Sequence, residues 1–263
     1  MPAEQPAPSI WLRPERSQVG RPAQHTRAEI TAVALDIADR EGLDAVSMRR
    51  VAAELDTGAA SLYRYVQTRE DLLDLMTDAT GAEYELGEPT GDWVADLVAV
   101  GEQSRTIMRR HPWLAGLVLA RPVIGPNGVA VLEHVLAALA GHPASLTAKM
   151  EAFALLNGIT ATSVLYEQAG GPDLQARNVA FLTHAIASGD HPRLAALISA
   201  ARPEEGVIDP ADRYPDVLAR LLTGLLGPQP EQRPQAPPQS APQSPPRPGE
   251  VGRETRDRSA SRV

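Results

Sequence analysis

The stretch SMRRVAAELDTGAASLYRYVQTREDLL, residues 47–73, decides the fold of this chain, because it predicts two short helices joined by a tight turn. Apolar side chains at positions 48, 51, 52 and 55 share one helical face, and Ser47 precedes them as a typical N-cap. The turn Asp56-Thr57-Gly58 then interrupts the pattern, and Gly58 is expected to supply a positive φ. Thr68 is the expected cap of a further helix. Two helices joined in this way can place one of them in a DNA major groove.

The second of these helices has a polar face of unusual composition. Leu62 and Val66 are expected to point inward, whereas the remaining face carries hydroxyls, aromatic rings and a guanidinium from Ser61 to Tyr65. An arginine can bind guanine O6 and N7 in a bidentate fork, which is worth about 1–3 kcal/mol of discrimination between bases. This face therefore predicts a surface that reads DNA.

The run ASLYRYVQTREDLLDLM, residues 60–76, preceded by a helical pattern over 30–41 and by Gly42, resembles the N-terminal domain of the TetR family of bacterial transcriptional regulators. The spacing Leu-Tyr-x-x-x-x-x-Arg-x-x-Leu-Leu from Leu62 to Leu73 is specific, and the resemblance covers residues 26–77. It implies three helices, the second and third forming a helix-turn-helix, and a fourth helix that leads into a regulatory domain. The alternative is a helical hairpin whose tyrosines only pack.

The resemblance also implies which residues contact DNA. They lie on the second helix, on the third helix and at the start of the fourth: Arg49, Ala60, Ser61, Tyr63, Arg64, Tyr65 and Arg69. Tyr63 corresponds to a tyrosine that meets phosphate and a thymine methyl group, and Tyr65 to a position near the DNA backbone. Arg69 and the helix N-terminus would share one phosphate. Because Ala59 and Ala60 offer only methyl groups, base reading is expected from Arg49, Ser61 and Arg64; for Arg49 the alternative is a solvated helix face.

The charge of the chain is unusual for a DNA-binding protein, since the net value is −8 and residues 21–80 carry seven arginines against eleven acids. Residues 47–69, however, hold four arginines against Glu54 and Asp56. Charges act on phosphates within roughly 8 Å at physiological salt, so the local balance matters more than the total. Few contacts per subunit are therefore expected, with both halves of a dimer needed to read a palindrome.

Composition narrows the remaining function classes. The chain has no cysteine, which excludes disulfides and thiolate chemistry, and no apolar run of about 18 residues that would span a membrane. Its beginning lacks the apolar core of an export signal, so a cytoplasmic location is expected. The six histidines form no metal-binding pair of the HExxH type, and no phosphate loop or nucleophile elbow is present. No enzymatic activity, metal or cofactor is predicted.

The predicted organisation is all-α, with a three-helix DNA-binding domain followed by a larger helical domain. Residues 1–25 are rich in proline and predict a disordered arm, in which Trp11, Arg13, Arg16 and Arg21 could alternatively follow DNA. The DNA-binding domain covers 26–77 and the regulatory and dimerisation domain 78–227, with a boundary at Gly87, Pro89 and Gly91. Residues 228–263 contain nine prolines and predict a disordered tail. Helices are expected over 26–41, 68–85, 91–110, 112–119, 127–140, 144–168, 173–188, 191–201 and 210–226.

The regulatory half has a second resemblance. HPWLAGLVLARPVIGPN, residues 111–127, is similar to the C-terminal domain class of the tetracycline repressor. That repressor binds magnesium and its drug through a histidine shortly before an Arg-Pro pair, and the corresponding residue here is Leu117. A magnesium–tetracycline ligand is therefore not expected. In this class the last two long helices build a four-helix dimer interface, which implies a homodimer through 144–168 and 210–226; burial inside one subunit would explain the same apolar pattern.

A mostly apolar pocket is expected between the regulatory helices, with a hydrophobic or amphipathic small molecule as its ligand. The candidate lining residues are Trp113, Leu117, Phe153, Asn157, Tyr166 and His184, with Trp93, Met108 and Phe181 as further candidates. The predicted function is a ligand-responsive repressor, released from its operator when the ligand shifts the helix at 68–85; activation of transcription is an alternative. The rival from another class is a helical small-molecule-binding protein or enzyme without DNA-binding activity.

Overall fold

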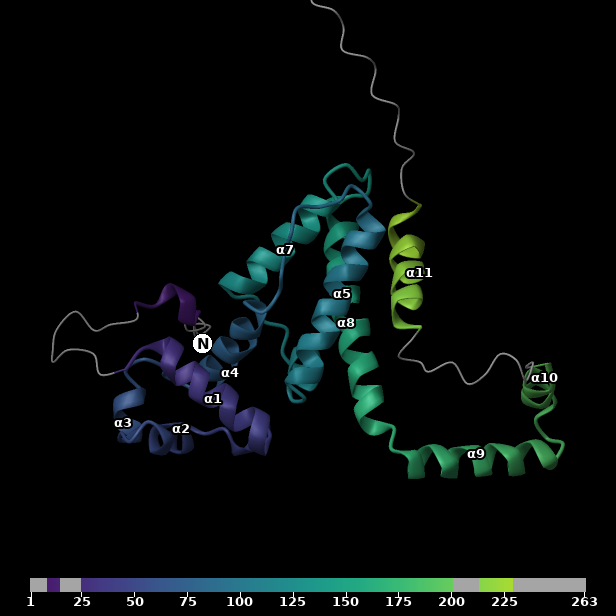
Figure 1. Ribbon diagram of the computed structural model, residues 1–263, viewed down its shortest axis with the longest axis horizontal. Coiled ribbons are helices and arrows are strands. Elements are labelled where there is room, and N and C mark those ends of the chain that lie inside the picture. The colour runs from purple at the N-terminus through teal and green to yellow at the C-terminus, as the bar shows by residue number, and fades with distance from the viewer. Residues whose placement is uncertain (1–8, 15–24, 201–212, 229–263) are drawn as a thin grey trace, which may run out of the picture. The chain divides into compact units, whose positions relative to one another are not determined.

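The computed structural model describes residues 9–14, 25–200 and 213–228. Every regular element within these ranges is a helix (Figure 1), as the sequence predicted. The elements in chain order are η1 (Ile10–Leu12), α1 (Arg27–Glu41), η2 (Leu43–Ala45), α2 (Met48–Glu54), α3 (Ala59–Leu62), α4 (Arg69–Gly81), α5 (Trp93–Arg110), α6 (Leu114–Ala120), α7 (Pro126–Ala138), α8 (Leu146–Ala169), α9 (Pro172–Ala187), α10 (Pro192–Ala200) and α11 (Tyr214–Leu226).

Local capping explains where the helices of the DNA-binding half begin and end. Ser47 accepts a hydrogen bond from the Arg50 amide and begins α2, and Thr68 forms a capping box with Asp71 at the start of α4. Gly42 ends α1 with a φ of 87°. The predicted start and stop signals at these three positions are confirmed.

The turn between α2 and α3 differs from the prediction. Gly58 has an ordinary φ of −81° and serves as the N-cap of α3, while the positive φ of 48° belongs to Asp56. Aspartate tolerates the left-handed region better than most residues because its short side chain bonds locally, so the turn does not need a glycine there. The prediction for Gly58 was wrong.

Two clusters of buried side chains form the core. The first joins α1, α2, α3 and α4 with the end of α5, with α6 and with the second half of α8, and it includes Leu62, Leu72, Met76 and Trp113. The second cluster fills the space among α5, α7, α8 and α11, around Leu97, Leu156 and Leu218. Figure 1 shows α11 alongside α5 and α8, with which it is in contact. Because α6 belongs to the first cluster, the DNA-binding helices and a regulatory helix share one apolar core.

Helix α4 is shorter than predicted, since it ends at Gly81 rather than near residue 85. Glycine is a poor helix former, and Gly81 lies so close to Asn127 of α7 that a Cβ there would approach the Asn127 Cβ to 2.9 Å. The close approach of α7 therefore coincides with the end of the helix. The segment from Ala82 to Asp92 then leads to α5.

The beginning of the chain also corrects a prediction. Residues 9–14 are ordered into η1 and the turn after it, and the Ile10 side chain is only 1% exposed, so the expectation of a disordered arm is wrong for this part of 1–25. Residues 1–8 and 15–24, and with them the predictions for Arg16 and Arg21, lie outside the described residues. The same holds for the tail from 229 to 263 and for 201–212. Within the described residues, no helix combines the length and the apolar content needed to cross a bilayer.

Candidate DNA-binding surface and ligand cavity

The predicted DNA-contacting residues fall into two groups. Arg49 on α2, Ala60 on α3 and Tyr63 and Arg64 in the turn after α3 are all exposed, with 49% of Tyr63 accessible. Ser61 lies between them but is half-buried, because its hydroxyl donates to the Gly58 carbonyl at 2.7 Å and lies 2.9 Å from the Thr57 hydroxyl. The helix-turn-helix therefore presents two guanidinium groups, a phenol and methyl groups to solvent.

Tyr65 and Arg69 are placed differently from the prediction. The Tyr65 side chain is 6% exposed and belongs to the core, because helical rotation turns it to the same side as Leu62. A DNA contact through its ring is therefore contradicted. Arg69 is exposed, but its guanidinium donates to the carbonyls of Val46 and Leu43, both at 3.2 Å. Arg69 thus holds the start of α4 against the segment that precedes α2.

The local positive charge is smaller than the sequence count indicated. Arg50 forms ion pairs with Glu41 at 2.9 Å and with Glu54 at 3.0 Å, and the hydrogen bond that Arg50 donates to Glu41 raises the pKa of Arg50. Among the described residues, Arg49 and Arg64 have no such carboxylate partner. On α2, on α3 and in the turn after α3, these two arginines remain available to phosphates or bases.

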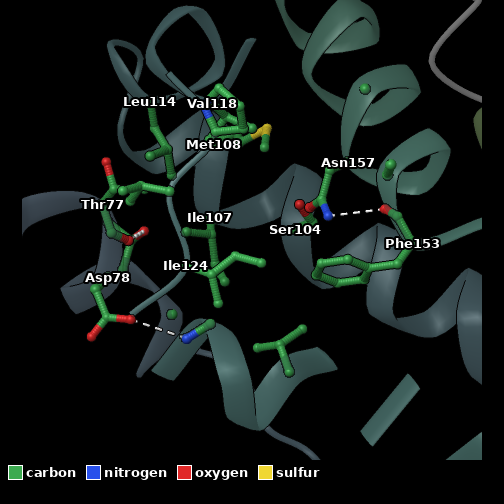
Figure 2. Close-up of a pocket in the computed structure, with 18 of the residues that line it drawn as sticks. Thr77, Asp78, Ser104, Ile107, Met108, Leu114, Val118, Ile124, Phe153 and Asn157 are labelled. Atoms are coloured by element: carbon green, nitrogen blue, oxygen red, sulfur yellow. Dashed lines mark hydrogen bonds between the residues drawn. The ribbon is translucent and has the colours of Figure 1, made fainter. Parts of the chain in front are cut away.

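A cavity of about 390 Å³ lies among α4, α5, α6, α7 and α8 (Figure 2). This size is typical of sites for small organic molecules. Most of its wall is apolar, and the chain contributes to it from five helices, from Tyr84 and from the loop between α6 and α7. The lining residues are Thr77, Asp78, Thr80, Gly81, Tyr84, Ser104, Ile107, Met108, Leu114, Val118, Leu119, Pro122, Val123, Ile124, Gly128, Val131, Met150, Phe153, Ala154, Asn157 and Gly158.

Few polar groups face this cavity, and most are already partly bonded. Asn157 donates its amide N–H to the Phe153 carbonyl at 3.0 Å (Figure 2), so its side-chain oxygen is the atom left to accept a bond. Burial raises the pKa of the Tyr84 phenol, although a hydrogen bond with Ser104 opposes that effect. The Asp78 carboxylate accepts from the Gly128 amide at 3.0 Å and from the Asn127 side chain at 3.2 Å. Asp78 is the single charged side chain among the lining residues that the structure describes.

Only part of the predicted pocket is found in this cavity. Phe153, Asn157 and Met108 line it, whereas Trp113 and Leu117 lie one residue away from the lining positions 114 and 118. A helix turns by 100° per residue, so these two side chains face α1 instead and line a separate groove with Asp39 and Leu43. The prediction that all candidates share one pocket was wrong for them.

The other candidates also lie outside the cavity. Tyr166 near the end of α8 is 73% exposed, and on α9 His184 is exposed and Phe181 is 69% exposed. Trp93 is buried in the second core cluster. Thr77 and Asp78 line the cavity although neither was a predicted site residue, and their polarity within the buried part of α4 was a usable signal. The loop residues Pro122, Val123 and Ile124 also line it, and no sequence signal marked them.

Partly buried polar bonds join the cavity region to the DNA-binding helices. His111, after α5, has one ring nitrogen 2.8 Å from an Asp39 oxygen of α1 and the other 2.7 Å from a Glu83 oxygen. Trp113 donates to Asp39 at 2.7 Å, and Arg121 donates to Asp74 of α4 at 2.7 Å. Helix α4 itself begins at the helix-turn-helix and lines the cavity further along. An apolar, ligand-sized cavity is thus connected to a surface suited to DNA.

These features define the class of protein: a ligand-responsive, DNA-binding transcriptional regulator with a helix-turn-helix. Residues 30–76 match the model of the bacterial regulatory proteins of the tetR family, and residues 87–227 match that of the tetracyclin repressor-like C-terminal domain. The chain therefore belongs to the TetR family, and the predicted resemblance and function class are confirmed.

Individual relatives agree with this assignment. The transcriptional repressor DrrR1 of Streptomyces coeruleorubidus is 36% identical over 231 residues, which cover 82% of this chain and 83% of the relative. The crystal structure of apo ActR from Streptomyces coelicolor matches with a TM-score of 0.69 and 31% identity, over 78% of this chain and 97% of that one. The complex of ActR with actinorhodin matches with a TM-score of 0.67 and 32% identity, over 80% and 99% of the two chains. The protein is a DNA-binding repressor that responds to a ligand.

Proposed function

We propose that this protein binds a palindromic operator as a homodimer and is released when a small, mostly apolar molecule fills the cavity among α4–α8. The observation that carries this proposal is the double role of α4, whose first turn follows the helix-turn-helix and whose residues 77, 78, 80 and 81 line the cavity. A ligand that binds more tightly to the conformation in which α4 is shifted lowers DNA affinity, by an amount set by the ratio of its affinities for the two conformations. Because the partner is operator DNA, we propose that the protein acts in the cytoplasm and is not an enzyme.

The proposed DNA contacts follow from exposure and from free donors. Arg49 and Arg64 are the base-reading candidates, with Tyr63 at a phosphate or thymine methyl group and Ala60 and Ser61 in the surface between them. Arg69 stays in the proposed set as a phosphate contact, because a guanidinium has five N–H donors and its bonds to two carbonyls leave others available. Tyr65 leaves the set, since its ring is buried.

The proposed dimer interface uses α8 and α11, which are in contact within one subunit. Each carries apolar side chains that this contact leaves exposed, with Leu155 of α8 46% and Leu221 of α11 43% accessible. Small residues such as Ala154 and Gly224 are exposed beside them and would permit close approach of a second copy. These exposed faces support the four-helix interface that the family resemblance implies.

The lining supports a restricted ligand chemistry. Phe153, Ile107 and Ile124 offer apolar surface to a compact or planar molecule, and Asn157 and Ser104 offer hydrogen bonds at one side. No lysine or arginine is among the lining residues described, whereas Asp78 brings a carboxylate. A carboxylate on the ligand would lose its hydration without gaining a cation, so we propose an uncharged or cationic ligand. In the similar ActR structure the bound molecule is actinorhodin.

The DNA-binding part is tested by fluorescence anisotropy of the full-length protein on a duplex selected from a randomised pool, at about 150 mM salt. Arg64→Ala and Tyr63→Ala are each expected to weaken specific binding, while Arg177→Ala on the exposed face of α9 serves as the matched control. Specific binding retained by both variants would place the contacts elsewhere. If no duplex can be selected even at low salt, the result would favour the rival function, a small-molecule-binding protein without DNA-binding activity.

A further inference from the structure

Residues 9–14 lie outside both family matches, yet they are packed into the molecule. Ile10 is buried, and the Arg27 guanidinium of α1 donates to the Ile10 and Arg13 carbonyls at 3.0 Å each and to the Pro14 carbonyl at 3.3 Å. The same guanidinium donates to the Tyr65 carbonyl at 3.0 Å. One arginine therefore joins this segment to α1 and to the residues that follow α3.

The side chain of Arg13 extends this connection to the turn before α4. It donates to the Gln67 side-chain oxygen at 2.6 Å and forms an ion pair with Asp71, and the two paired side chains are only 13% and 14% exposed. The other Asp71 oxygen accepts from the amides of Gln67 and Thr68, at 3.2 and 3.1 Å. Arg13 thus fixes the carboxylate that organises the turn between α3 and α4.

The ionisation of Asp71 agrees with this geometry. Burial alone would raise the pKa of its carboxyl, but hydrogen bonds from Arg13 and Thr68 outweigh that effect and hold this pKa below its ordinary value. The carboxylate is therefore charged at neutral pH, when it can accept from both amides of the turn.

At its other end the segment reaches the cavity wall. A Cβ placed on Gly125 would overlap both the Trp11 ring and the Asp78 carboxylate, so the indole lies directly against this backbone. Gly125 caps α7 and follows Pro122, Val123 and Ile124, which line the cavity. The segment therefore touches the α6–α7 loop through Trp11 and the α3–α4 turn through Arg13.

We propose that residues 9–14 form a strap in which Trp11 and Arg13 are positioning residues that hold the cavity wall and the turn after α3 in a fixed relation. The strap is a further connection between the ligand cavity and the DNA-binding surface, in addition to α4 and to the polar bonds of His111, Trp113 and Arg121. Its consequence for the DNA response rests on the proposed function, whereas its positioning role does not.

Hydrogen exchange measured by mass spectrometry on the full-length protein tests the positioning role without ligand or DNA. The variants are Trp11→Ala and, as the matched control in the same short helix, Leu12→Ala, whose side chain is 79% exposed. Trp11→Ala is expected to accelerate exchange by at least about fivefold both at 66–69 and at 122–129, because opening at both places would become easier. Leu12→Ala is expected to leave both segments as in the wild type.

The strap would be overturned if Trp11→Ala left hydrogen exchange unchanged or accelerated it only at residues 9–14. It would also be overturned if exchange accelerated uniformly, α11 included, because that would indicate general destabilisation. In parallel, Trp11→Ala is expected to bind the selected duplex at least about threefold more weakly than Leu12→Ala, as for a modest coupling between sites. Equal affinities would overturn the consequence for DNA binding. A wild type that binds no DNA would end the proposed function, while the exchange result would still decide the strap.

Discussion

The Asp78 carboxylate joins two helices and borders the ligand cavity at the same time. It belongs to α4, accepts bonds from Asn127 and Gly128 in the first turn of α7, and is 8% exposed. The N-terminus of a helix carries partial positive charge and unpaired amides, which suit a carboxylate. This explains how a charged group is tolerated next to an apolar wall.

Replacing Asp78 by alanine is expected to lower the free energy of unfolding by about 1–3 kcal/mol, because the amides at the start of α7 lose their buried acceptor. Urea denaturation followed by circular dichroism measures the change. Glu70→Ala, on the exposed surface of the same helix, is the control and is expected to have little effect. Equal losses in the two variants would contradict the capping role of Asp78.

At the scale of elements, α4 depends on its first turn. Thr68 accepts from the Asp71 amide at 3.0 Å, and Asp71 accepts from the Thr68 amide in return. This reciprocal pair lies directly after the turn that follows α3, so it sets the direction in which α4 leaves the DNA-binding surface.

Thr68→Ala is expected to cost about 0.5–2 kcal/mol of stability, the usual effect of losing a capping side chain, and to weaken DNA binding together with it. Differential scanning calorimetry and anisotropy on the selected duplex would measure both effects. Thr106→Ala changes an exposed threonine in the second half of α5 and removes a hydroxyl without removing a cap. If both threonine variants behave alike, the box at Thr68 does not determine the geometry of α4.

At the scale of the whole molecule, α8 is held to α5 by charge as well as by packing. Glu167 of α8 accepts from Arg105 at 2.5 Å and from Arg109 at 2.8 Å, and the Arg105 side chain is 9% exposed. Burial alone would raise the pKa of Glu167, but the hydrogen bonds from Arg109 and Arg105 outweigh it and hold this pKa below the ordinary value of 4.5.

A carboxyl whose pKa is lower in the folded state stabilises the fold at pH values above its unfolded pKa, and this stabilisation is lost as the pH falls through the folded pKa. Wild type is therefore expected to be more stable than Glu167→Gln by about 1–3 kcal/mol at pH 7, with the difference shrinking steadily below about pH 4.5. Thermal melts across this range measure it. A difference that stays constant with pH would show that the charge of Glu167 is not what stabilises the pair.

The proposed dimer gives a further prediction at this scale. Leu155→Arg places a charge in the exposed apolar face of α8 and is expected to convert the protein to a monomer in sedimentation equilibrium, because a buried unpaired charge is costly. Leu146→Arg is the matched control, since Leu146 is 67% exposed and lies nine positions earlier, on the opposite face of the same helix, and it is expected to leave the oligomeric state unchanged. A dimer that survives Leu155→Arg would place the interface elsewhere.

The sequence by itself determined the helices and the family of this protein. Ser47, Gly42 and Thr68 act through bonds to residues only three or four positions away, and the apolar spacing of α2 and α4 follows the period of one helix. Signals of this kind are complete within a short window, so they could be identified before the tertiary structure. The exposed polar face after Gly58 could be predicted for the same reason.

The tertiary structure decided which side of each helix meets which neighbour. Trp113 and Leu117 face α1 rather than the cavity, Tyr65 is buried, and Arg69 bonds to carbonyls more than twenty positions earlier in the chain, at Val46 and Leu43. Trp11 touches Gly125 although over a hundred residues separate them. A shift of one position rotates a helical side chain by 100°, and the direction of a whole helix is set by packing between distant segments. The cavity and the strap arise from such packing, which no local pattern encodes.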